Sequence, residues 1–256
     1  GNAVERHRIG SLNCEGKIVV DMFAGLGYFT LPYLVHAKAE HVYACDLNSH
    51  AIEALRNNLD LNKVADKCTI LHGDVLKTCP EGKADHVNLG LIPSCEKFWE
   101  KGTRALKECG GVLHIHEVVT TVPPFHHAIG EWPCLGCVIF EHWIKLAMKR
   151  PSNLALDEII NKSCNIVVRY NVKGMIDLQV TENSLECCWR KIHYLKWGIH
   201  VLHTIGDYMQ NNRGGIWQFS INKVYKIKDF SPHKAHLVID IACCPISKCF
   251  KFSTVY

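Results

Sequence analysis

The stretch VVDMFAGLGYFTLPYL, residues 19–34, decides the fold, because two glycines in it separate two apolar runs. The first run ends at Asp21, and the turn that follows carries Gly25 and Gly27. Glycine lets the backbone of such a turn approach a ligand closely, and the helix that follows offers its N-terminal N–H groups to that ligand. The stretch therefore predicts the first strand–turn–helix unit of a nucleotide-binding sheet.

This turn differs from the two familiar phosphate-binding motifs. Thr30 stands where the dinucleotide fingerprint has its third glycine, and no Gly-Lys-Ser/Thr sequence follows as it would in a P-loop. With no pyrophosphate to hold, the turn favours an adenosyl group that lacks phosphates as its ligand.

Short, β-branched apolar segments alternate with helical patterns between residues 17 and 119, which is typical of a parallel sheet covered by helices. The expected strands are residues 17–23, 41–47, 68–74, 84–91 and 111–119. A helix is expected over 49–62, with Ser49 as its N-cap, and another over 96–111, with the glycine pair at its end as C-cap. The residues expected on the apolar face of the first of these helices are Ile52, Leu55, Leu59 and Leu61.

The alternation stops after Val119. Residues 120–137 have the composition of a loop, 138–149 of a helix, and order returns with a helix over 195–210 and strands over 217–227 and 235–244. We therefore predict an α/β, Rossmann-like fold with a mostly parallel seven-stranded sheet and an antiparallel edge. Its expected parts are a cofactor-binding half (1–119), an atypical insertion or lid (120–195), and a C-terminal helix with edge strands (196–256).

Two further acids end predicted strands. Asp46 ends the second strand, where a carboxylate can accept hydrogen bonds from both ribose hydroxyls. Asp74 ends the third, where it can accept from the adenine amino group while Val75 contributes its backbone N–H. Each aspartate alone fits a helix cap or turn equally well. Together with the glycine turn, and in this order along one sheet, they point to S-adenosylmethionine.

Composition limits the class of protein. The 256 residues are 48% hydrophobic and 21% charged, as in globular proteins, and the net charge of +4 permits a nucleic-acid partner without demonstrating one. No apolar run reaches membrane-spanning length, and no signal-peptide core is present. The 14 irregularly spaced cysteines favour free thiols in a reducing compartment. We therefore expect a cytoplasmic protein that does not bind a membrane.

The sequence resembles the wybutosine-synthesising aminocarboxypropyltransferases, relatives of the tRNA guanine-37 N1-methyltransferases that share a class I methyltransferase-like fold. The matching text includes GNAVERHRIGSL, VVDMFAGLGYFTLPYLVHA, VYACDLN, ADHVNLGLIPS and KIKDFSPHKAHLVIDIACCP. It covers residues 1 to about 118 and about 196 to 246. The resemblance implies that S-adenosylmethionine contacts Arg6, Asp46, Asp74 and Val75. We also assign the turn residues Asp21, Phe23, Gly25 and Gly27 to this cofactor site.

The element NLGLIPS, residues 88–94, bears on the group transferred. Methyl-transferring relatives commonly carry Asn/Asp-Pro-Pro or Asn-Leu-Pro after the fourth strand, whereas here the proline is displaced to Pro93. This favours transfer of the 3-amino-3-carboxypropyl group to the tricyclic guanosine derivative at position 37 of tRNA-Phe, with Asn88 touching the base. One alternative is a tRNA methyltransferase of the guanine-37 N1 type, which would use the same pocket with the methyl group turned inward. The other is a non-catalytic remnant that binds cofactor or tRNA, because residues 120–195 match the family poorly and the chain starts inside the motif GNAVER.

Metal-ligating residues give weaker signals. His114 and His116 lie on one face of a predicted strand and Glu117 on the other, which we interpret as structural. The sequence CLGC at 134–137 is a single Cys-x-x-Cys without a partner pair, so we expect no metal.

Overall fold

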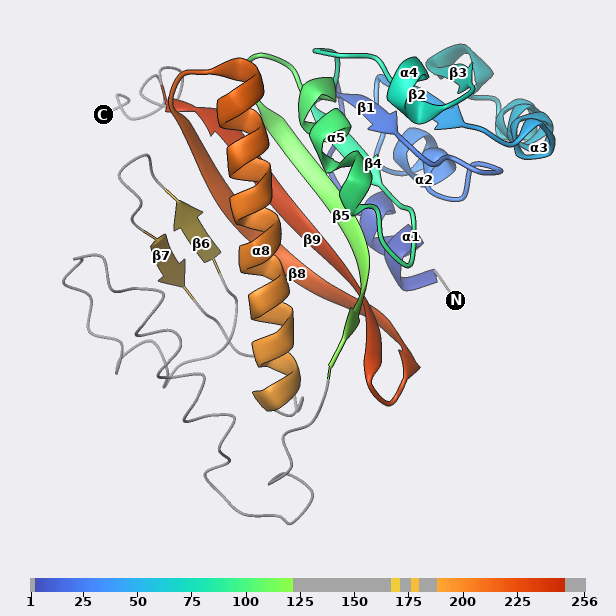
Figure 1. The fold of residues 1–256 in the computed structure, drawn as a ribbon. Coiled ribbons are helices and arrows are strands. Elements are labelled where there is room, and N and C mark those ends of the chain that lie inside the picture. Colours follow the sequence, from blue (N-terminus) through green and yellow to red (C-terminus); the bar gives the residue numbers. More distant parts are fainter. Residues whose placement is uncertain (1–2, 122–166, 171–175, 180–187, 247–256) are drawn as a thin grey trace, which may run out of the picture.

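The computed structural model describes residues 3–121, 167–170, 176–179 and 188–246. They form a nine-stranded sheet in the order β3-β2-β1-β4-β5-β9-β8-β6-β7, with helices on both faces (Figure 1). The first five strands of this order are mutually parallel, and the other four are antiparallel to their neighbours.

The strands are short in the parallel half and long at the antiparallel junction. The parallel strands are β1 (Ile18–Asp21), β2 (His41–Asp46), β3 (Cys68–His72), β4 (His86–Leu89) and β5 (Gly111–Thr120). The antiparallel strands are β6 (Val167–Tyr170), β7 (Ile176–Gln179), β8 (Trp217–Ser231) and β9 (Lys234–Pro245). The helices are α1 (Ala3–Gly10), α2 (Thr30–Val35), α3 (Ser49–Leu61), α4 (Val75–Thr78), α5 (Trp99–Ala105) and α8 (Cys188–Arg213).

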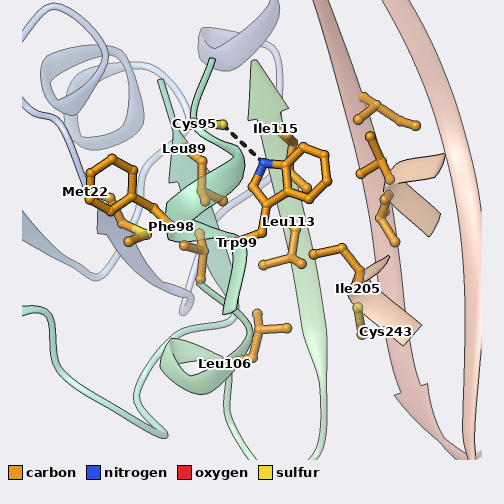
Figure 2. Close-up of a cluster of buried hydrophobic side chains, with 14 of the residues drawn as sticks. Met22, Leu89, Cys95, Phe98, Trp99, Leu106, Leu113, Ile115, Ile205 and Cys243 are labelled. Carbon is orange, nitrogen blue, oxygen red and sulfur yellow. Dashed lines mark hydrogen bonds between the residues drawn. The ribbon is translucent and has the colours of Figure 1, made fainter. Parts of the chain in front are cut away.

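Two hydrophobic cores lie on opposite faces of the sheet, because neighbouring residues of a strand point to opposite sides. Val19 packs into the core beneath α1, α2 and α3, and Val20 packs into the core beneath α5 and α8. Figure 2 shows the second core, in which the indole of Trp99 lies beside Ile115 and donates its Nε1–H to Cys95 Sγ at 3.3 Å. The ring centroid of Trp99 also lies 5.7 Å from that of His200 of α8. The central parallel strands are therefore covered on both faces, as is usual for parallel sheets.

The expected fold class is confirmed, and all seven predicted strands are present. The sheet is larger than predicted because β6 and β7, from the segment 120–195, extend its antiparallel edge. Most of that segment, including the helix expected over 138–149 and the CLGC sequence, lies outside the described residues. The division into three parts stays a prediction.

Three predictions about the ends of helices were wrong. The N-cap of α3 is Asn48, whose side chain accepts from the N–H groups of His50 and Ala51, so Ser49 is already inside the helix. Leu61 is 79% exposed, although the other three residues of that face are buried. Helix α5 ends at Ala105.

The glycine pair after α5 belongs to the turn that enters β5. Gly110 has a φ of +88°, and a side chain on it would collide with the Cys243 carbonyl of β9. Close approach of a neighbouring strand therefore explains this glycine, and a helix C-cap does not.

Candidate functional site

The chain order of the parallel strands reverses between β1 and β4, and ligands of open α/β sheets bind at such a switch point, outside the carboxyl ends of the strands. Asp21 ends β1 and lies in register with Asn88 of β4. Asp46 ends β2, next to β1 in the sheet. The topology therefore gathers three of the predicted site residues at one edge.

The glycine turn is tied to the end of β2 by Asp46. Its Oδ2 accepts the N–H of Gly25 at 2.7 Å, and its Oδ1 accepts the N–H of Asn48 at 2.8 Å. Gly25 and Gly27 have φ values of +54° and +96°, which favour glycine. A Cβ on Gly27 would also lie 2.8 Å from Leu55 Cδ1. Each oxygen of the half-buried Asp46 carboxylate retains acceptor capacity for a ligand hydroxyl.

Asp21 lies beneath the turn, with no exposed surface. Its Oδ2 accepts from Thr30 Oγ1 at 2.8 Å and its Oδ1 from Asn88 Nδ2 at 3.0 Å. Burial raises the pKa of this carboxyl, and the hydrogen bonds from Asn88 and Thr30 oppose the rise. Thr30, the residue that breaks the dinucleotide fingerprint, thus supports the turn from below. Asp21 supports the site through this network, and a direct contact with cofactor stays a prediction.

Asn88 is fully buried, and its Oδ1 has no hydrogen-bond partner among the described residues. The loop after it contains a cis peptide bond between Ile92 and Pro93 and is held to β5, since the Pro93 carbonyl accepts the N–H of Val118 at 2.8 Å. A buried amide oxygen without a partner at a switch point is suited to accept a hydrogen bond from a bound molecule.

Asp74 and Val75 begin α4 at the end of β3. Asp74 is exposed, and its Oδ1 accepts the N–H of Leu76 at 3.0 Å, so it caps the helix. The side chain of Val75 is buried. This is the capping role that strand-end aspartates often have, and the carboxylate has a further oxygen for a ligand.

Two other residues predicted for the site, Arg6 and Phe23, make contacts with aromatic rings. The exposed guanidinium of Arg6 lies 5.2 Å from the ring centroid of Tyr28, which follows Gly27. Phe23 makes an edge-to-face contact with Phe98, with ring centroids 4.9 Å apart. The structure thus places Arg6 at the glycine turn, although the residues lie on separate elements.

Sequence reasoning missed the role of Glu117. Its Oε2 accepts from Ser94 Oγ at 3.1 Å, in the loop that follows β4. Burial raises the pKa of Glu117 to about 7, and the charge of Glu96 adds to the rise, while Ser94 and His200 oppose it. The sequence predicted that Glu117 lies on the strand face opposite His114 and His116. No local sequence pattern predicts its contact with Ser94.

A buried polar network on the other face of β5 was also missed. Arg8 of α1 donates to both oxygens of Glu5 and to Asp240 Oδ2, each at 2.7 Å. Asp240 Oδ1 lies 2.7 Å from His114 Nδ1, and Glu5 Oε1 lies 3.4 Å from His116 Nε2. Both histidines therefore take part in protein contacts. Within the described ranges, no group of three or more metal-ligating side chains is arranged around a common point.

No helix of the described residues is both long and apolar enough to cross a bilayer.

The comparisons with known proteins agree on one family. The model of the TRM5/TYW2 methyltransferase domain matches residues 1–129. The chain is 38% identical over 248 residues to a tRNA wybutosine-synthesizing protein 2 homolog of Mus musculus and 36% identical over 247 residues to that of Homo sapiens. Each alignment covers 96% of this chain and 50% of the relative, so the chain spans about half the length of these relatives.

Solved structures share the fold. M. jannaschii TYW2 in complex with AdoMet superposes with a TM-score of 0.56 at 24% identity, covering 96% of this chain and 76% of that one. Trm5b from Pyrococcus abyssi superposes with a TM-score of 0.57 at 21% identity, covering 94% of this chain and 48% of that one. With the glycine turn, the strand-end acids and the family model in agreement, the chain belongs to the TRM5/TYW2 methyltransferase-domain family.

Proposed function

We propose that this chain carries the catalytic domain of an S-adenosylmethionine-dependent aminocarboxypropyltransferase. Its acceptor would be the tricyclic guanosine derivative at position 37 of tRNA-Phe, in wybutosine biosynthesis. The observation that carries this proposal is the similarity, over 96% of the chain, to relatives named tRNA wybutosine-synthesizing protein 2. Eight cysteines of the described residues are free thiols, which supports a reducing compartment such as the cytoplasm.

The residues at the switch point fit this cofactor. Asp46 can accept from ribose hydroxyls while it holds Gly25, and Asp74 can accept from the adenine amino group while it caps α4. Gly25 leaves open space where a side chain would stand, so a ligand can approach the backbone there. Arg6, exposed above Tyr28, can bind the cofactor carboxylate.

When bound, S-adenosylmethionine supplies a sulfonium whose three attached carbons are all electrophilic, so the position of the acceptor decides which carbon is transferred. The chain therefore needs to position the base. Asn88 is the residue we assign to this task, because its Oδ1 is buried without a described partner and its Nδ2 is held by Asp21. Aminocarboxypropyl transfer breaks a carbon–sulfur bond, forms a carbon–carbon bond and releases a proton from the base together with methylthioadenosine.

Methyl transfer is the second candidate, favoured by the family model, which joins TRM5 and TYW2 proteins in one domain. It would use the same pocket with the methyl carbon facing the acceptor.

The test is to incubate the chain with S-adenosylmethionine and tRNA-Phe that carries the tricyclic precursor, and to analyse nucleosides and spent cofactor by mass spectrometry. We expect an aminocarboxypropyl mass gain and methylthioadenosine, both lost in Asn88→Ala and kept in the exposed-surface control Asn13→Ala. A methyl gain with S-adenosylhomocysteine would replace the proposal by the second candidate. Cofactor binding without any product would leave a binding domain only.

A further inference from the structure

The β8–β9 hairpin, together with the last part of β5, projects past the carboxyl end of the neighbouring strand β4. The last pairing of β4 with β5 joins Leu89 to Ile115, whereas the pairing of β5 with β9 continues to Thr120 and Lys234. Five further residues of strand extend the hairpin by roughly 15 Å at a typical rise per residue. The hairpin therefore flanks the candidate site on the side where α1 and the N-terminus lie (Figure 1).

One face of this hairpin is turned toward α1. Directly paired residues of neighbouring strands share a face, and Lys223 pairs with Asp240, Tyr225 with Val238 and Lys228 with His236. Asp240 is bound to Arg8 of α1. The guanidinium of Arg8 also lies 4.6 Å from the ring centroid of Tyr225, which places this face next to α1.

This face combines cations with aromatic rings. Lys223 Nζ lies 5.0 Å from the ring centroid of Tyr225, and Lys228 Nζ lies 4.5 Å from that of Phe230. Phe230 is 46% exposed, and Lys223 and Lys234 are exposed. We call Lys223, Lys228, Phe230 and Lys234 the hairpin surface.

The described residues do not neutralise the charges of the hairpin surface. In the part of the chain that the structure describes, no carboxylate lies within ion-pair distance of Lys223, Lys228 or Lys234. The hairpin has two acidic residues: Asp229 pairs with Lys226 at 3.1 Å, and Asp240 pairs with Arg8 at 2.7 Å. The three lysines follow one face of the hairpin, and the exposed ring of Phe230 lies against Lys228 near the tip, so this surface attracts a polyanion and can stack a planar group.

We propose that the hairpin surface binds the substrate RNA, with the three lysines on backbone phosphates and Phe230 stacked on an unpaired base. The inference rests on the proposed function, which supplies an RNA substrate. Phosphate contacts position a nucleic acid, and bases that are splayed out of a loop stack on aromatic side chains. An acidic protein would be attracted by the lysines alone and would leave the exposed ring without a matching group.

The experiment measures binding of a fluorescein-labelled tRNA-Phe transcript by anisotropy over a range of salt concentrations. The variant K223Q/K228Q/K234Q is compared with K17Q/K67Q/K83Q, which removes the same charge. Lys17, Lys67 and Lys83 are exposed and lie at the amino ends of β1, β3 and β4, at the opposite edge of the sheet. A separate variant, Phe230→Ala, removes the ring without changing charge. Thermal unfolding and calorimetry with S-adenosylmethionine verify that each variant is folded.

We expect K223Q/K228Q/K234Q to weaken RNA binding at least tenfold more than its control. The slope of log affinity against log salt should become shallower by roughly two, since each lost phosphate contact removes about 0.7 to 0.9. Phe230→Ala should weaken binding roughly tenfold with an unchanged salt slope. Cofactor affinity should stay the same in all variants.

The outcomes separate this inference from the proposed function. Equal losses in the two triple variants would overturn the hairpin surface as the RNA site while leaving an RNA-binding enzyme. An unchanged affinity in Phe230→Ala would overturn the stacking contact. No RNA binding by the unaltered chain at low salt would overturn the proposed function, and this inference with it.

Discussion

Single carboxylates at the switch point have different roles because their surroundings differ. Asp46 is half-buried and ties two backbone segments together, so it can meet a ligand while it holds the turn. Asp21 is fully buried and accepts hydrogen bonds from Thr30 and Asn88, so it supports the site by holding these two side chains in place. Glu117 contacts the loop after Asn88 through Ser94. Both the turn and the loop are thus held by side chains that come from other strands.

Substitution of Asp46→Ala should weaken S-adenosylmethionine binding at least tenfold, because a charged acceptor is worth about 1.5 to 3 kcal/mol. It should also lower the free energy of unfolding by about 1 to 2 kcal/mol, because the N–H groups of Gly25 and Asn48 lose their acceptor. Isothermal calorimetry and urea unfolding measure the two effects. Asp60→Ala, on the exposed side of α3, is the matched control. The same cofactor affinity in both variants would remove Asp46 from the site.

Glu117→Gln should change the pH dependence of stability. The folded-state pKa of Glu117, about 7, lies above its ordinary value of 4.5, so the folded protein favours the protonated form. The resulting loss of stability is absent below pH 4.5, grows between pH 4.5 and about 7, and is constant above that pH. Gln removes it, and we expect a gain of roughly 1 kcal/mol at pH 8, limited by solvent screening, and none at pH 4. Urea unfolding at both pH values is the measurement, with the exposed Glu53→Gln as control. A destabilised Glu117→Gln at pH 8 would contradict the assignment.

At the scale of elements, α1 is attached to the far end of the chain. Arg8 lies between Glu5 of its own helix and Asp240 of β9, 232 positions away along the sequence. Although burial acts to raise the pKa of Glu5, hydrogen bonds from Arg8 and His116 lower it to about 2. This contact holds α1, and with it Arg6, beside the glycine turn. The site thus depends on both ends of the described chain.

Arg8→Ala should destabilise the fold by about 3 to 5 kcal/mol, because it leaves two buried carboxylates without their cation. Glu5 and Asp240 are 0% and 5% exposed. Chemical denaturation at neutral pH measures the loss, and His7→Ala on the exposed side of the same helix should change stability little. A loss in Arg8→Ala no larger than in His7→Ala would mean that this ion pair does not anchor α1.

At the scale of the whole molecule, one hydrophobic core joins the parallel and antiparallel halves of the sheet. Helices α5 and α8 cover both halves on one face, and their buried residues belong to the same cluster as Val20 of β1 and Ile239 of β9. Figure 2 shows Ile205 of α8 next to Leu113 of β5 in this cluster. We therefore expect the described strands of both halves to unfold together.

Ile205→Ala should lower the free energy of unfolding by about 2 to 5 kcal/mol, because it leaves a cavity at a fully buried position. Hydrogen exchange should show the same decrease in protection at Val20 and Ile239, one amide from each half of the sheet. The control Ile216→Ala removes a side chain that is 50% exposed and should change stability by less than about 0.5 kcal/mol. Loss of protection at Ile239 alone would show that the halves unfold separately.

Much of the fold and part of the site could be predicted from sequence. The alternation of apolar segments with helical patterns was enough for the parallel strands and the antiparallel edge, because strand and helix periodicity are local properties of the chain. The glycine turn and the acids at the strand ends were recognisable for the same reason. The ends of elements were less predictable, as Asn48 and Gly110 illustrate, because caps and close approaches depend on atoms of other segments.

The local sequence was therefore sufficient for the fold class, the position of the switch point and the acids that surround it. Only the tertiary structure decided that Asp240 anchors α1, that Ser94 meets Glu117 and that Lys223 and Lys228 of β8 share one face beside the site. These partners are far apart in the chain and carry no common local pattern. Strand order and register bring them together, and both are set by the packing of the whole sheet against its helices.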